Sequence, residues 1–397
     1  MTLDSKSIKG CLLRDAEKAT RFAIIALNGV STLAQIGQLG ITFVLFPLSL
    51  ELRHVPAWKI GIVSSGLWAG SLIGLVAAPS AIRRMGYRST VCLGLLASIV
   101  ALLLTPIIPQ RYWVLGSLVT GLGYGLRWIG NETWLFGIVS DRTRGRIVGL
   151  HESLLGIASI AGPALVALLG ADGFPSFITA AAFTAAAAFP LILASLYNSP
   201  PTMEARPFKS LLSAVEGTIA GITRTGPLTA GIGGVIESAL ISMFPVFASE
   251  RGIGAGKIAW LLSIFGFGAM LLQLPIGWLA DRRGVHVASL IVVVLTVLCA
   301  LAMEVIAPPG MVMLGVLIFV LGGAITGFLT LGIVAAAKQS NPGQLAAEMS
   351  TVSIAFTITS VVGPLVAGGL FTLFGSASLL VLIELSAALL LLLLARR

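Results

Sequence analysis

The stretch Gly277-Trp-Leu-Ala-Asp281-Arg282-Arg283-Gly284 lies between two long apolar runs, and an altered copy of it occurs earlier in the chain. The copy reads Pro79-Ser-Ala-Ile-Arg83-Arg84-Met85-Gly86, 198 positions before (277 against 79). A chain that repeats at about half its length, with apolar helices in both halves, is typical of transporters built from two similar bundles. Other repeated landmarks are Phe46-Pro47 with Phe244-Pro245, Lys59-Ile60 with Lys257-Ile258, Gly70 with Gly268, Gly121 with Gly322, and Gly162-Pro163 with Gly363-Pro364.

The composition is that of a membrane protein. Hydrophobic residues make up 57% of the chain and charged residues only 10%, against about 25% charged in a soluble domain. The 46 glycines suit spans that pack closely. The net charge of +9 comes from basic residues in short loops, which is an orienting signal rather than a sign of nucleic-acid binding. The three cysteines show neither a disulfide framework nor metal-ligand spacing.

Apolar runs of the length that crosses a bilayer, about 20 residues, predict twelve spans in an all-α membrane protein. The predicted bounds are 22–50, 57–81, 89–109, 112–140, 147–171, 174–197, 226–249, 255–280, 286–307, 310–337, 345–374 and 376–395. We expect two pseudo-symmetric six-helix bundles, 22–197 and 226–397, joined by a polar cytoplasmic linker at 198–225. A cytoplasmic N-terminal segment, 1–21, precedes them, and the length of the run after it favours a retained first helix over a cleaved export signal.

Loop charges predict the orientation. Arginines follow the second, fourth and eighth spans and close the chain, whereas the alternate loops carry few charges. The positive-inside rule therefore places both termini in the cytoplasm, with the protein in the cell (inner) membrane. Trp58, Trp113 and Trp260 fall near the predicted outer ends, where aromatic side chains anchor spans at the interface.

The stretch Gly277–Gly284 resembles the loop signature of the major facilitator superfamily, Gly-x-Leu-Ala-Asp-Arg-x-Gly. In that family the loop joins the second and third helices of each half and is a charged latch that holds the outward-open state. The first-half copy has Arg83 where the acid is expected, so the resemblance implies a complete latch only in the second half. The latch residues that it implies are Gly277, Asp281, Arg282 and Gly284, with Arg84 and Gly86 in the first-half copy.

Two further stretches resemble motifs of the same family. Gly162-Pro163 is similar to the core of its antiporter motif, and Gly363-Pro364, followed by Ala367-Gly368-Gly369, is closer to the full pattern. The run from Asn131 to Trp134 and the arginines after it resemble small-molecule efflux branches. The resemblance covers the whole chain and implies a central cavity that opens to one side at a time, with export favoured over import.

Polar residues form one-sided stripes on the first and fourth predicted spans, stepping by three and four residues. Such a stripe avoids lipid, where its hydrogen bonds would be unmet. It either lines a cavity or bonds neighbouring helices. The family resemblance implies that the first, fourth and seventh helices line the cavity. We therefore expect substrate contacts from Asn28, Gln35, Gln38, Tyr124, Arg127, Asn131, Trp134 and Glu237.

Charged side chains inside spans are costly and need a function or a partner. Arg127 either binds an anionic group of the substrate or pairs with one of the embedded carboxylates. Glu132 and Glu152, with His151, are candidates for proton exchange or for a structural network near the cytoplasmic end. Glu237 is the third proton-coupling candidate, and its alternative is a bond to a neighbouring helix.

The chain has no P-loop and no metal-like grouping of His and Cys, so we expect no enzyme activity, no cofactor and no metal. The sequence predicts a monomeric secondary transporter that exports a small organic solute in exchange for H⁺. Its expected partners are the solute, the proton and the lipid bilayer, without nucleic acid. Two rival hypotheses are a proton-coupled importer of a small organic anion or metal chelate, and a membrane sensor or scaffold that moves nothing.

Overall fold

The computed structural model describes residues 5–140, 143–197, 224–305, 310–339 and 345–395, and within these ranges the secondary structure is helical. The N-terminal half contains α1 (Ser5–Gln35), the π-helix η1 (Ile36–Ile41), α2 (Thr42–Glu51), α3 (Ala57–Leu104), the short η2 (Gln110–Tyr112), α4 (Trp113–Ile138), α5 (Arg144–Leu169), α6 (Phe174–Ala186) and α7 (Ala188–Tyr197). The C-terminal half contains α9 (Thr225–Ser249), α10 (Ala255–Arg283), α11 (Val285–Val305), α12 (Met311–Gln339), α13 (Leu345–Phe374) and α14 (Ala377–Ala395).

The described helices supply the twelve expected spans. Ten segments are long and apolar enough to cross a bilayer. One of them, Ala57–Leu104, contains two spans that meet at Gly86, where φ is 82°. The twelfth span is α4, whose embedded polar residues lower its hydropathy. The first span begins at Lys18 within the longer α1, slightly before the predicted start, and the linker predicted at 198–225 lies outside the described residues up to 223.

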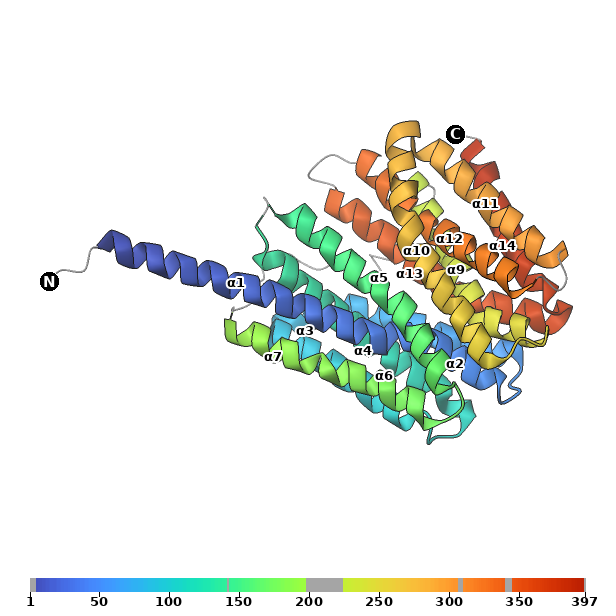
Figure 1. Cartoon of the computed structure of the whole chain (residues 1–397), viewed down its shortest axis with the longest axis horizontal. Helices are drawn as coiled ribbons and strands as arrows, with labels where there is room; N and C mark the ends of the chain where they lie inside the picture. The colour runs from blue at the N-terminus through green and yellow to red at the C-terminus, as the bar shows by residue number, and fades with distance from the viewer. Residues whose placement is uncertain (1–4, 141–142, 198–223, 306–309, 340–344, 396–397) are drawn as a thin grey trace.

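The two halves lie side by side, with α1, α4, α6 and α7 on one side and α10, α11, α12 and α14 on the other (Figure 1). Equivalent glycines make equivalent contacts in each half. A Cβ on Gly70 would meet the carbonyl of Leu118, and one on Gly268 would meet that of Phe319. Both contacts bring the second span of a half against its fourth, so the sequence repeat is a repeat of helix packing.

The halves touch at one end of the bundle. We call the end with the turn at Gly284 the terminal face, and the end with the turns at 52–56, 105–112, 170–173 and 250–254 the opposite face. From the opposite face to mid-span, the hydrogen bonds that join the halves include Trp58 N to Thr372 Oγ1 (3.1 Å), Ser65 Oγ to Val361 O (2.7 Å) and Ser263 Oγ to Ile160 O (2.8 Å).

The side of α5 that packs against α10 shows where the contact between the two halves ends. A Cβ on Gly156 would meet Met270, and this approach of α5 to α10 lies well away from the opposite face. One to two turns further along the same side, Gly149, Glu152 and Ser153 are exposed. The halves therefore separate toward the terminal face, which the charge pattern predicts to be cytoplasmic.

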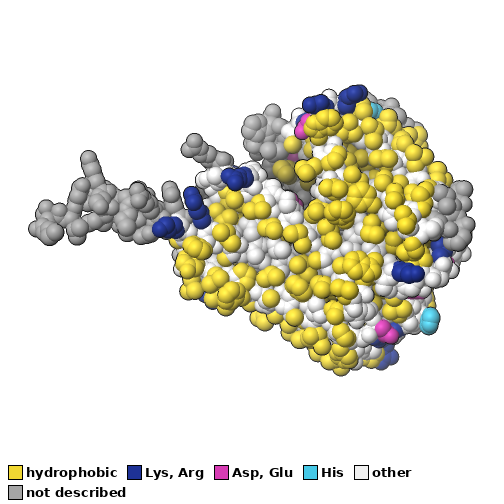
Figure 2. Space-filling view, in the orientation of Figure 1, with side chains coloured by type: hydrophobic (Ala, Val, Ile, Leu, Met, Phe, Trp, Pro, Cys, Tyr) yellow, Lys and Arg dark blue, Asp and Glu magenta, His cyan; other side chains and the backbone are white. Residues whose placement is uncertain are grey.

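Hydrophobic side chains cover most of the visible surface, with Lys and Arg near its edges (Figure 2). This is the surface expected of a chain solvated by lipid. Trp58 and Trp260 are exposed, as predicted for interfacial anchors. Trp113 is fully buried, so the prediction was wrong for this residue: it packs against Phe46 and Phe177 inside the N-terminal half.

Candidate functional site

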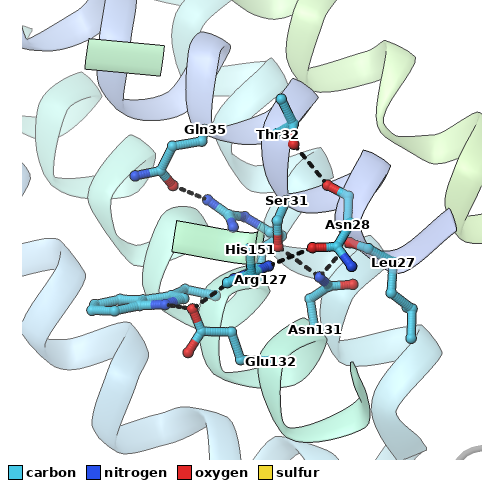
Figure 3. Close-up of polar contacts among 10 residues, drawn as sticks. Leu27, Asn28, Ser31, Thr32, Gln35, Arg127, Asn131, Glu132 and His151 are labelled. Atoms are coloured by element: carbon cyan, nitrogen blue, oxygen red, sulfur yellow. Dashed lines mark hydrogen bonds and ion pairs between the residues drawn. The ribbon is translucent and has the colours of Figure 1, made fainter. Parts of the chain in front are cut away.

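The polar stripes of the first and fourth spans face each other in this structure. Each stripe residue is at most 8% exposed, so neither stripe lines an open cavity as the sequence led us to expect. The reason is that lipid offers no hydrogen-bond partners. Polar groups on two adjacent spans therefore have a lower free energy when they hydrogen-bond to one another than when they face lipid. Figure 3 shows the resulting network between α1, α4 and α5.

Arg127 of α4 occupies the centre of this interface and is fully buried. Its Nε donates to Gln38 Oε1 at 2.9 Å and its Nη2 donates to Gln35 Oε1 at 3.0 Å. No carboxylate of the described residues lies within ion-pair distance of it, and its Nη1 has no acceptor in the described structure. The guanidinium is thus held by two amide oxygens, rather than by any of the three carboxylates that sequence analysis offered as partners.

Gln38 also hydrogen-bonds to the third span. Its Nε2 donates to Ser98 Oγ at 2.7 Å, and Ser98 Oγ donates to Thr120 O at 3.0 Å. The ring of Tyr124 lies 5.1 Å from the guanidinium carbon of Arg127 and stacks on Trp128. Arg127 therefore ties α1 and η1 to α4, and Gln38 ties them to α3.

Replacing Arg127 by Met is expected to destabilise the protein by about 1–3 kcal/mol for each glutamine oxygen left without a donor. Lys at this position should not restore stability, because a single ammonium does not present two separate donors at the positions of Nε and Nη2. The measurement is the unfolding midpoint of the purified protein in detergent. Arg146→Met, at an exposed position, is the control and should change stability by about 0.5 kcal/mol or less. Equal midpoints for both variants would contradict the structural role.

Two other predicted contact residues are also packed between helices. Asn131 Nδ2 donates to Leu27 O at 2.9 Å and to Ser31 Oγ at 2.7 Å, while its Oδ1 has no described partner. Trp134 is fully buried in an apolar cluster that includes Leu27 and Tyr87. This position separates Trp134 from the polar network.

The hydrogen bonds around His151 determine where a proton lies. Asn28 Nδ2 donates to Ile24 O at 2.8 Å, which turns Asn28 Oδ1 toward His151 Nδ1 at 2.9 Å. Since Oδ1 only accepts, Nδ1 carries a hydrogen. On the other side of the ring, Nε2 lies 3.3 Å from Glu132 Oε1. A neutral imidazole and an ionised carboxylate would present two lone pairs to each other there.

The contact between His151 Nε2 and Glu132 Oε1 is a hydrogen bond when one of the two groups carries a hydrogen there. Either the imidazole is charged and the carboxylate ionised, or both groups are neutral and Glu132 donates. Glu132 is further held by Trp128, whose Nε1 donates to the same carboxylate oxygen. Trp128 lies one helical turn before Glu132 on α4, a spacing of four that sequence reasoning overlooked although it is visible in the chain.

Glu152 of α5 faces the gap between the halves. It is exposed, and it lies one turn from Gly156, where contact between α5 and α10 stops. It follows His151 directly in the chain and lies close enough to Glu132 for their charges to interact. The structure thus brings the predicted trio of Glu132, His151 and Glu152 together, with Glu152 as the member open to the gap.

Glu237 of α9 lies far along the sequence from this trio, in the C-terminal half. It is partly exposed, although most of its neighbours along α9 are buried, and it has no hydrogen bond or ion pair with another described residue. Gly233 packs against Phe328 and Gly234 against Phe356 O, so the glycines before Glu237 allow α12 and α13 to approach α9 closely. The bond to a neighbouring helix that was the alternative for Glu237 is absent among the described residues.

The predicted latch residues lie toward the terminal face, within the last two turns of α10 or at its end, and at the bend of α3. Gly86 and Gly284 both adopt positive φ, 82° and 87°, which explains the glycine that ends each copy of the motif. Asp281 Oδ1 lies 3.5 Å from Lys338 Nζ, and Lys338 also donates to Ala280 O at 2.9 Å. Arg282 lies over the ring of Trp278. These contacts of Asp281 and Arg282 stay within the C-terminal half.

The π-helix in the first span is a feature that the sequence did not reveal. It contains Gln38, and its two glycines pack on α6 and α5: Gly37 meets Ala180 O, and Gly40 meets Ala158 O and Gly162. The Gly-Pro element of α5 is therefore the surface on which η1 rests. Single-turn π-helices are frequent at functional sites, and this one positions an acceptor of Arg127.

The sequence profile of the Major Facilitator Superfamily matches residues 29–232 and again 228–397, once for each half. The chain belongs to the Major Facilitator Superfamily. It is 27% identical over 369 residues to the uncharacterized MFS-type transporter YfkF of Bacillus subtilis, covering 92% of each chain, and 25% identical over 349 residues to the uncharacterized MFS-type transporter YcaD of Escherichia fergusonii, covering 87% of each. It is thus a multi-pass transporter of this superfamily and not an enzyme.

Solved structures of the superfamily share its fold. The nucleoside transporter NupG superposes with a TM-score of 0.71 at 16% identity, covering 94% of this chain and 98% of NupG. A bacterial homolog of the human lysosomal transporter Spinster, in an inward-facing and unoccupied conformation, superposes with a TM-score of 0.63 at 14% identity, with 95% of each chain covered. At these identities the likeness concerns the architecture of this transporter alone.

Proposed function

We propose that this transporter exports a small organic solute in exchange for protons. The observation that carries the proposal is the contact of His151 Nε2 with Glu132 Oε1, inside a span and next to a carboxylate, Glu152, that faces the gap between the halves. A proton placed there is insulated from lipid and lies near the path that opens toward the terminal face. Rocking of the halves would change its access from one side of the membrane to the other.

In the C-terminal half, we propose that the solute and the proton compete for the carboxylate of Glu237. An unpaired carboxylate inside a bundle needs a proton or a donor group from a bound molecule. A solute that presents a cationic or hydrogen-bond-donating group satisfies Glu237 in one state, and a proton satisfies it in the other. Mutual exclusion at Glu237 keeps solute and proton from being bound there together, and the pair of His151 and Glu132 carries the proton across, so both sites are needed for exchange. Gln35 and Tyr124, at the least buried edge of the α1–α4 network, are the further contacts that we propose for the solute.

We further propose that the protein acts as a monomer in the cell (inner) membrane, with the terminal face in the cytoplasm. The arginine-rich loops support this orientation. In this orientation, the structure has its gap open to the cytoplasm, where an exporter collects its solute. The turns with Gly86 and Gly284 act as latches when the terminal face closes, and Asp281 changes partner between the two states.

The function is tested by proton movement driven by solute. A thermal-shift screen of the purified protein against solute classes at two pH values identifies a ligand, because a ligand bound to the folded state raises the unfolding midpoint. Liposomes containing the protein, a pH-sensitive dye and that ligand are then diluted into ligand-free buffer. Exchange predicts that the lumen becomes acidic as solute leaves. A lumen that becomes alkaline would show co-transport, and an unchanged pH would contradict coupling.

Glu237→Gln is expected to weaken solute binding about 10- to 100-fold, the value of a hydrogen bond to a charged group. In the unmodified protein, binding should weaken as pH falls, because protons compete for the carboxylate; in the variant this pH dependence should disappear. Isothermal titration at pH 6 and pH 8 measures both effects. Glu384→Gln, which removes a carboxylate from the span α14, is the matched control and should retain affinity and pH dependence. Unaltered pH dependence in Glu237→Gln would exclude competition at this residue.

An anionic solute is the second candidate, favoured by one observation. Arg127 has no acidic partner among the described residues, and its Nη1 lacks an acceptor. An anion that reached Arg127 would have to displace Tyr124 or Gln35, because the guanidinium is fully buried. Organic anions and organic cations in the thermal-shift screen separate the two candidates. If the solute is an anion bound at Arg127, anions should raise the unfolding midpoint, and they should raise it equally in Glu237→Gln.

A further inference from the structure

A basic pocket lies on the opposite face of the N-terminal half, away from the proposed proton and solute sites. It has a volume of about 600 Å³. Its lining includes Arg53 in the turn between α2 and α3, Lys59 in the first turn of α3, and Arg111 in the connection to α4, and we call the end with these three cations its mouth. The two connections are about fifty residues apart in sequence, and only the packing of α3 against α4 brings their cations together.

The pocket combines a charged mouth with an apolar wall. No acidic residue lines it, and none of its three cations has an ion pair with a described carboxylate. Deeper in the pocket, the wall consists of Ile62 and Val63 of α3 and Val114 of α4, which belong to the spans. Ile62 is exposed where these helices meet the bilayer. A ligand that fits has an anionic head and a hydrocarbon tail.

Each of the three cations lies over an aromatic ring. The guanidinium carbon of Arg53 lies 4.8 Å from the ring centre of Trp113, and Lys59 Nζ lies 5.3 Å from that of Trp58. Arg111 lies over Tyr112 in the same way. Rings attract cations without neutralising them, so the full positive charge remains available to an anion at the mouth.

The C-terminal half provides an internal comparison. At the equivalent place, a cavity of only about 60 Å³ is lined by apolar residues and one cation, Arg251. Arg251 is already engaged: it lies over the ring of Phe247 and donates to Phe247 O at 3.1 Å and to Ser376 Oγ at 3.3 Å. The repeated fold therefore does not require a basic pocket. In addition, the three cations of the N-terminal half lie on the opposite face, where the positive-inside rule predicts few positive charges.

We propose that this pocket binds the headgroup phosphate of an anionic phospholipid from the leaflet at the opposite face. Arg53, Lys59 and Arg111 contact the phosphate, and an acyl chain lies along Ile62 and Val114. Each cation near an anionic lipid surface contributes enough attraction for about a fivefold change in affinity. The proposal is independent of the transported solute and of proton coupling.

The test is lipid-dependent stability of the purified full chain in detergent. Phosphatidylglycerol is added at increasing concentration, and the unfolding midpoint gives an apparent affinity. Phosphatidylcholine with the same acyl chains and inorganic phosphate are the other two probes. We expect phosphatidylglycerol to raise the midpoint well above either of them, because only this lipid has both a net negative head and a tail.

Two variants decide whether the pocket is responsible. The double variant Lys59→Gln with Arg111→Gln should weaken the apparent affinity for phosphatidylglycerol about 25-fold, fivefold for each charge. Lys257→Gln removes the repeat-related lysine from the same face and should leave the affinity unchanged. Equal affinities in all three proteins would overturn the proposal. A midpoint increase fully reproduced by inorganic phosphate would also overturn it, by showing a soluble-anion site. Counting of bound phosphatidylglycerol by native mass spectrometry checks the result independently of stability.

Discussion

Glu132→Gln is expected to abolish solute accumulation driven by a pH gradient. The glutamine has the size and shape of the glutamate, and an amide oxygen in the place of Oε1 still accepts from Trp128, but the neutral side chain can neither take up nor release a proton beside His151. What disappears is the proton that moves between the two groups. A gradient of one pH unit supports about a tenfold accumulation for each coupled proton, whereas the variant should equilibrate solute to a ratio of about one.

The measurement is solute uptake into proteoliposomes with and without an imposed pH gradient. Exchange of labelled for unlabelled solute, which needs no net proton movement, should persist in Glu132→Gln and shows that the protein is folded. Glu384→Gln, the same chemical change in α14, should accumulate solute as the unmodified protein does. If Glu132→Gln also accumulates solute normally, the proton between His151 and Glu132 is structural, and coupling belongs elsewhere.

Gly70→Ala is expected to prevent α3 and α4 from packing. The added Cβ would overlap the carbonyl oxygen of Leu118 and lie 2.8 Å from the backbone nitrogen of Leu122. Backbone atoms do not rotate out of the way as a side chain does, so the two spans must separate. Overpacking in a well-packed core costs about 1–3 kcal/mol or more. Gly268→Ala, at the repeat-related position, should cause a similar loss, because its Cβ would meet the backbone of Phe319.

Size-exclusion profiles and unfolding midpoints in detergent test this expectation. Gly149→Ala is the control, because nothing lies within 4 Å of a Cβ at that helical position. The control should be neutral or more stable by about 0.5–1 kcal/mol, since alanine favours the helix. If Gly70→Ala and Gly149→Ala have the same midpoint, the close approach of α3 and α4 is not what stabilises the half.

Sequence reasoning succeeded for features that repeat locally. Apolar runs predicted the spans, and the recurrence of Gly70 as Gly268 predicted two equivalent bundles, which the equivalent packing of these glycines confirms. One limit is instructive. Trp113 has the position of an interfacial anchor but is buried, because the arrangement of α4 turns it toward Phe46 and Phe177. The spans predicted at 57–81 and 89–109 are both present, joined within α3 at the bend made by the positive φ of Gly86.

The candidate site could be assembled only in part. Periodicity correctly predicted that the residues of each polar stripe share one helix face. It does not predict what that face packs against, and in the structure the two stripes pack against each other. Likewise, the sequence offered three carboxylates to Arg127, and the structure pairs it with two glutamines 89 and 92 positions away. The partner of Glu132 is His151, 19 positions later on the next helix.

By itself, the sequence determined that this chain crosses a membrane many times, that its halves are copies, and which few polar groups the spans contain. These properties depend on hydrophobicity and helical period, which act between neighbours in the chain. Only the tertiary structure decided that His151 of α5 meets Glu132 of α4, that Glu237 is left without a partner among the described residues, and that two separate turns form a basic pocket. Such arrangements depend on how far each helix is rotated and shifted against the next, and close packing of backbone at glycines sets that geometry.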